Sequence, residues 1–140
     1  MTLSWTSVAP YAAAYGVTAL VMLAVDLVWL GVIAKPLYAQ AIGHLMSDEP
    51  YLPAALLFYA IFPLGLMIFA VAPVGAPTGW RTALLMGGLF GFFAYATYDL
   101  TNLTTLRNWP ISLALIDIAW GTFICGVSAA AGRATLDRMA

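Results

Sequence analysis

The sequence predicts an all-α membrane protein: a bundle of four transmembrane helices with a short interfacial amphipathic helix after the first span. Hydrophobic residues make up 64% of the 140 residues and charged residues 8%, whereas soluble domains carry about 25% charged residues. Five basic and six acidic side chains cannot cover the surface of a water-soluble domain of this size. The composition therefore excludes a soluble globule and favours a single integral membrane domain over residues 1–140.

Four long apolar runs supply the spans, since a transmembrane helix needs about 20 such residues. The runs cover residues 11–34, 51–72, 81–101 and 111–131. The first run is about twice as long as the core of a secretory signal and has no basic segment before it, so we predict a retained helix. Pro53 and Pro63 are expected to start and to kink the second helix.

The segment between the first two spans reads KPLYAQAIGHLMSDEPY over residues 35–51. Pro36 suits the first turn of a helix, and the apolar residues Leu37, Ala41 and Leu45 recur at helical spacing, which predicts a short helix lying in the membrane interface. The one histidine, His44, lies in this segment without a second ligand of the usual kind nearby, so we expect it to be partly solvated. The single cysteine excludes an internal disulfide and cysteine-bound metal, and we expect no metal and no cofactor.

The basic residues near the spans predict the orientation, because Lys and Arg are enriched in cytoplasmic loops. Arg81, Arg133 and Arg138 share one side of a four-span chain, and Lys35 and Arg107 lie on the other. This margin of one residue favours cytoplasmic termini and leaves dual topology open. We expect Arg133, Asp137 and Arg138 to form a solvated tail. A net charge of −1 without a basic stretch excludes nucleic acid as a partner.

Three aspartates lie in or beside the spans, and the topology places them in the same half of the bilayer. At a rise of 1.5 Å per residue, Asp26 is about 12 Å deep and Asp117 about 10 Å deep, with Asp99 nearer the headgroups. Each carboxylate costs about 2.5–3.5 kcal/mol at the centre of a spanning helix. We therefore expect all three to point into the bundle, in the outer half under the favoured orientation.

Helical spacing predicts which side chains accompany these carboxylates. Trp29 and Trp120 each follow an aspartate by three residues, and an indole offers both an N–H donor and a face for a cation. Tyr95 shares a helix face with Asp99. The polar stretch after the third span adds Thr101, Asn102 and Arg107, and Arg107 is the expected counter-charge.

A purely structural role remains open, because intramembrane polar groups can simply hold helices together. Asp99, Asn102 and Arg107 fit a stapled helix end as well as a functional site. We favour a ligand site for Asp26 and Asp117, which lie deeper. Small residues at positions 87 and 91, both glycine, are expected to pack helices closely.

Three motifs, DLVWLG (26–31), YDLTNLTTLRNWP (98–110) and DIAWG (117–121), occur in this order within the four apolar segments. Together they resemble a family of small four-helix bacterial inner-membrane proteins catalogued only as a domain of unknown function, over essentially the whole chain. The resemblance implies a bacterial inner membrane and carries no established activity. It implies a site built from Asp26, Trp29, Asp99, Thr101, Asn102, Arg107, Trp109, Asp117 and Trp120.

Three functions remain as alternatives. The first is binding or transport of a proton, a cation or a polar lipid headgroup by the Asp/Trp/Arg cluster, for which a homodimer would enlarge the pathway. The second is a non-catalytic partner subunit of a larger membrane complex. The third is a lipid-modifying membrane enzyme, which ranks last because the chain has no nucleophilic serine motif, no HExxH and no nucleotide loop.

Overall fold

The computed structural model describes residues 4–73 and 79–140, and within these ranges the chain is helical and has no strand. The main helices are α1 (Trp5–Val28), α2 (Lys35–Ile42), α3 (Leu52–Leu66), α4 (Trp80–Thr105) and α5 (Ile111–Met139). Two π-helical segments, η1 (Trp29–Ile33) and η3 (Met67–Val71), extend α1 and α3, and the 3₁₀ turn η2 (Gly43–Leu45) follows α2.

Four of these helical stretches are long and apolar enough to cross a membrane, which confirms the predicted fold class for the described residues. They run over Trp5–Ile33, Leu52–Val71, Trp80–Thr105 and Ile111–Met139. The first, third and fourth are longer than the apolar runs from which we expected them. Helical hydrogen bonding continues into the polar flanks, so apolar composition alone underestimates the length of these three helices.

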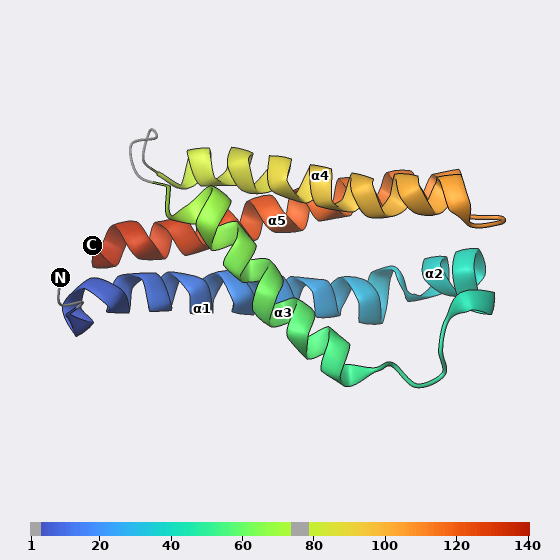
Figure 1. The fold of residues 1–140 in the computed structure, drawn as a ribbon, viewed down its shortest axis with the longest axis horizontal. Helices are drawn as coiled ribbons and strands as arrows, with labels where there is room; N and C mark the ends of the chain where they lie inside the picture. The colour runs from blue at the N-terminus through green and yellow to red at the C-terminus, as the bar shows by residue number, and fades with distance from the viewer. Residues whose placement is uncertain (1–3, 74–78) are drawn as a thin grey trace.

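The helices form a bundle with α5 at its centre (Figure 1). Helix α5 packs along both α1 and α4, while α3 crosses the bundle obliquely and α2 extends beyond one end. Both ends of the chain lie at the opposite end of the bundle from α2. Consequently the end of α1, the end of α4 and the start of α5 lie together near α2.

The contact between α4 and α5 is close because glycines face the opposing backbone. A Cβ atom built on Gly87 would lie 2.6 Å from the carbonyl oxygen of Cys125, and one on Gly91 would lie 2.2 Å from that of Gly121. Any side chain at these positions would separate the helices. The expected packing role of Gly87 and Gly91 is therefore confirmed, and Cys125 is fully buried in this interface.

Helix α3 packs on α1. Its π-helical extension η3 packs extensively on α4. The hydroxyl of Tyr15 in α1 donates a hydrogen bond of 2.8 Å to the carbonyl oxygen of Ala60, close to Pro63. Proline has no N–H to continue the helical ladder, so this part of α3 is where the backbone is most easily bent. This arrangement leaves the first half of α3 away from α4.

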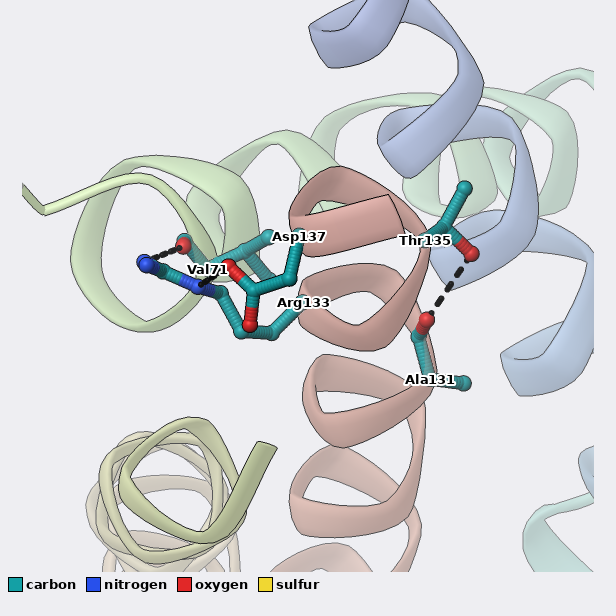
Figure 2. A network of polar contacts seen from close by, with 5 residues as sticks. All are labelled: Val71, Ala131, Arg133, Thr135 and Asp137. Atoms are coloured by element: carbon teal, nitrogen blue, oxygen red, sulfur yellow. Dashed lines mark hydrogen bonds and ion pairs between the residues drawn. The ribbon is translucent and has the colours of Figure 1, made fainter. Parts of the chain in front are cut away.

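At the end of the bundle that holds the two chain ends, Arg133 joins α5 to the end of α3 (Figure 2). Its Nε donates to Asp137 Oδ1 at 2.8 Å, and its Nη1 donates to the carbonyl oxygen of Val71 at 3.0 Å. The side chain is only 13% exposed. The expectation of a solvated tail is therefore wrong for Arg133, because this guanidinium satisfies a carbonyl at the end of η3, where the helix supplies no partner.

Candidate functional site

A cavity of about 440 Å³ lies where α1, α4 and α5 meet beneath α2 and α3. Its lining is mostly aromatic, contains two carboxylic acids and includes no basic side chain from the described part of the chain. The lining residues are Asp26, Trp29, Leu30, Tyr38, Phe58, Phe62, Ala94, Tyr95, Tyr98, Asp117 and Trp120. Five of the residues named from the sequence thus line one cavity: Asp26, Trp29, Tyr95, Asp117 and Trp120.

Asp26 is 6% exposed and receives donors from two other helices. The hydroxyl of Tyr59 in α3 donates to Oδ2, and the indole N–H of Trp120 in α5 donates to Oδ1 at 3.1 Å. Hydrogen bonds to a charged acceptor are stronger than neutral ones. Asp26 therefore has a partner for each oxygen and links α1, α3 and α5 at the wall of the cavity.

Asp117 is 7% exposed and is paired with a residue of the short helix. The hydroxyl of Tyr38 in α2 donates to Asp117 Oδ1 at 2.6 Å. Burial, reinforced by the neighbouring carboxyl group of Asp117, raises the pKa of Tyr38 well above its ordinary value. Tyr38 thus stays protonated at neutral pH, and this hydrogen bond holds α2 over the site.

Two tryptophans stack beside these carboxyl groups. The rings of Trp29 and Trp120 are 4.2 Å apart between centroids and 9° from parallel. Trp29 is the first residue of the π-helical segment η1, and its indole N–H is buried without a hydrogen-bond partner among the described residues. This wall of the cavity therefore offers aromatic surface, whereas the Trp29 N–H is itself buried.

Asp99 is fully buried next to Asp117 and does not itself line the cavity. The Trp109 indole is a second neighbour, yet neither Asp99 oxygen has a hydrogen bond of acceptable geometry within the described ranges. Burying an ionised carboxylate without a partner is costly. The described residues supply no basic partner for this pair of acidic groups.

The structure places Thr101, Asn102 and Arg107, named from the polar stretch after the third predicted span, outside the cavity. Arg107 is exposed and forms no ion pair with any described carboxylate, so its expected role as counter-charge is wrong. The reason is that α4 continues six residues beyond Asp99 and carries the loop about 9 Å further along the helix axis. Thr101 is exposed and donates to the carbonyl oxygen of Tyr98 in its own helix at 3.0 Å. Asn102 is half-buried and does not line the cavity.

Trp109 folds back from this loop and packs against the end of α4. It is 8% exposed, and its ring meets Tyr98 edge-on with centroids 5.9 Å apart. The turn before it contains Asn108 with φ of 59°, a left-handed conformation that asparagine tolerates better than most residues. This turn reverses the chain and returns Trp109 to the neighbourhood of Asp99.

Sequence reasoning missed the two tyrosines that bond the carboxyl groups, Tyr38 and Tyr59. Besides Tyr38, it missed five residues that line the cavity: Leu30, Phe58, Phe62, Ala94 and Tyr98. One signal was available for Tyr59: a hydroxyl deep in an apolar span without charge needs a buried acceptor. Spacing along one helix could not reveal either tyrosine, because both come from elements other than those that carry the aspartates.

Comparison with known proteins gives the family. No curated protein and no solved structure matches the chain. A sequence model for the family described as "Predicted membrane protein (DUF2177)" matches residues 11–134. The chain therefore belongs to the DUF2177 family, and its four candidate spans make it a multi-pass membrane protein.

Proposed function

We propose that this protein binds a cation in the cavity between α1, α3, α4 and α5, in exchange with protons on the acidic side chains. The observation that carries the proposal is the composition of the wall: Asp26 and Asp117 face a cavity that is otherwise aromatic and apolar and has no basic side chain from the described residues. A cation supplies the charge that the wall lacks. An anion would meet two carboxyl groups with no counter-charge.

The aromatic lining favours an organic cation over a small metal ion. Cation–π contacts contribute about 0.5–2 kcal/mol each when the cation lies over a ring, and Trp29, Tyr95 and Trp120 all line the cavity. A metal ion would instead require several closely grouped ligands. No group of three or more His, Cys, Asp or Glu side chains suited to a metal occurs in residues 4–73 and 79–140.

Helix association alone accounts less well for this arrangement. Polar groups that only join helices need partners and close packing, but they do not need an open volume of about 440 Å³ between them. Asp26 and Asp117 have their donors and still line that volume. The cavity therefore supports binding in addition to the structural contribution of the hydrogen bonds.

The test is calorimetric titration of tetramethylammonium into the purified protein in lipid nanodiscs at neutral pH. We expect Asp26→Asn and Asp117→Asn each to weaken binding at least about tenfold, which corresponds to about 1.4 kcal/mol. Asn keeps the size of the side chain and one acceptor oxygen, so the loss reports on charge and, at Asp26, also on one hydrogen-bond acceptor. The matched control is Asp48→Asn, because Asp48 is exposed in the loop before α3 and does not line the cavity. Equal affinities in all four proteins would refute the proposal.

We further propose that the protein lies in a bacterial inner membrane with both termini in the cytoplasm, which puts the cavity in the outer half of the bilayer. The support is the small excess of basic residues at the end of the bundle where both termini lie. A cysteine replacing Asp48 should then react with an impermeant maleimide added outside intact cells, whereas one replacing Ala140 should not. Cys125 is fully buried and gives a low background. The reverse labelling pattern would invert the orientation.

A further inference from the structure

We infer that the bound cation carries an apolar tail and enters the cavity sideways from the bilayer, between α3 and α4. This inference rests on the proposed function, because it names the class of cation that the same cavity would take. Three features of the site support it: the divergence of α3 and α4, the exposed residues of the lining and the charge of the lining.

Helices α3 and α4 diverge towards the start of α3 and the end of α4 (Figure 1). These helices meet through Phe62, whose ring centroid lies 5.4 Å from that of Phe90 and 6.4 Å from that of Tyr95. Towards the start of α3 and the end of α4, Phe58 and Tyr98 line the cavity and yet are 38% and 56% exposed. The same side chains therefore face both the interior of the site and the surface that the bilayer surrounds.

The rim of this opening suits an alkyl chain. Leu30 also lines the cavity and is 44% exposed, and Ala94 presents only a methyl group to it from α4. These residues are apolar, whereas Asp26 and Asp117 are the charged side chains of the lining. An amphiphile fits this distribution with its charged group at the carboxylates and its chain leaving between α3 and α4.

The charge of the lining separates cationic amphiphiles from ordinary phospholipids. A zwitterionic headgroup would bring its phosphate next to Asp26 and Asp117, and the lining has no basic side chain from the described residues to neutralise it. Unpaired like charges in a poorly solvated site are unfavourable. The lining therefore favours a ligand with net positive charge, such as an alkylammonium, over a zwitterionic lipid.

The experiment compares tetramethylammonium, decyltrimethylammonium and decylphosphocholine with the protein in nanodiscs, and subtracts partition into empty nanodiscs. In the unmodified protein we expect the decyl cation to bind at least about tenfold more tightly than tetramethylammonium, because each buried CH₂ adds to the affinity. Ala94→Phe narrows the opening, and the ratio of the two affinities should fall below about twofold. Ala119→Phe, on an exposed face of α5 outside the cavity, should keep the original ratio.

Leu30→Trp adds bulk to the exposed part of the lining from η1 and provides a second variant, should Ala94→Phe fail to fold. An unchanged affinity ratio in the folded rim variants would overturn the lateral entry, and decylphosphocholine binding as tightly as the decyl cation would overturn the charge selection. In both cases, sensitivity of tetramethylammonium binding to Asp26→Asn would leave the proposed function intact. No binding of either cation by the native protein would overturn both proposals together.

Discussion

Tyr59 tests the site at the scale of one residue, because its hydroxyl donates to Asp26 from another helix. Tyr59→Phe removes one donor from a buried carboxylate, and hydrogen bonds to charged groups contribute about 1.5–3 kcal/mol. The ionised form of Asp26 loses more than the protonated form, so cation binding should weaken several-fold at neutral pH and require a higher pH to reach half its maximum. Tetramethylammonium titrations between pH 5 and 9 measure this.

The control for this change is Tyr51→Phe, which removes a hydroxyl that is on a 75% exposed residue before α3. Its affinity and pH profile should match those of the unmodified protein. A Tyr59→Phe profile that moves to lower pH would contradict the donor role of Tyr59.

Single-residue patterns predicted some of this site and failed for the rest. The rise of the helix predicted that Asp26 and Asp117 lie in the same half of the bilayer, and the structure brings them to one cavity. The three-residue spacing also predicted an indole near each carboxyl group, although Trp120 donates to Asp26 of another helix and not to Asp117 of its own. Trp120 reaches Asp26 because α1 packs against α5, and the spacing of residues along one helix cannot predict this packing. The role of these carboxyl groups and indoles in ligand binding stays a prediction.

Gly121 tests the site at the scale of helix packing. A Cβ atom built on Gly121 would lie 2.1 Å from the ring of Tyr95, which lines the cavity from α4. Gly121→Ala must therefore displace this ring or separate α4 from α5, and overpacking of this kind typically costs about 1–3 kcal/mol. We expect a lower thermal unfolding midpoint together with weaker binding of tetramethylammonium.

The matched control is Gly16→Ala in α1, where a Cβ atom would meet nothing within 4 Å. Alanine is the better helix former by about 1 kcal/mol, so this variant should be as stable as the unmodified protein or slightly more stable. A Gly121→Ala protein with native stability and affinity would show that Tyr95 has room to move without affecting the cavity.

The sequence predicted those helices that follow directly from apolar composition and spacing. Four long apolar runs predicted four spanning helices, and Pro36 with its apolar spacing predicted the short helix α2. The π-helical segments η1 and η3 were not expected, since they reflect tertiary packing more than local preference. The oblique course of α3 was also not expected. The inferred entry between α3 and α4 depends on this course, so the sequence predicted the carboxyl groups but not a route to them.

At the scale of the whole molecule, charge is divided between the two ends of the bundle. Arg133 and Asp137 neutralise each other at the end that carries the chain termini, whereas Asp26, Asp99 and Asp117 gather near the other end without a basic partner from the described residues. Adjacent carboxyl groups cannot all ionise in a poorly solvated site. Under the proposed function, a cation replaces protons on these carboxyl groups.

Exchange of this kind links cation binding to pH with a definite sign. Protons and the cation compete for the same carboxyl groups, so affinity for tetramethylammonium should rise with pH and binding should release protons, because linkage is reciprocal. Tyr38 and Tyr59, which face these groups, remain hydrogen-bond donors to them and do not supply the protons. In a weakly buffered solution we expect cation binding to release protons, measured with a pH-indicator dye. The Asp26→Asn, Asp117→Asn double variant should release none. Binding that is independent of pH between 5 and 8 and releases no protons would rule out exchange at these carboxyl groups, even if a cation enters the cavity.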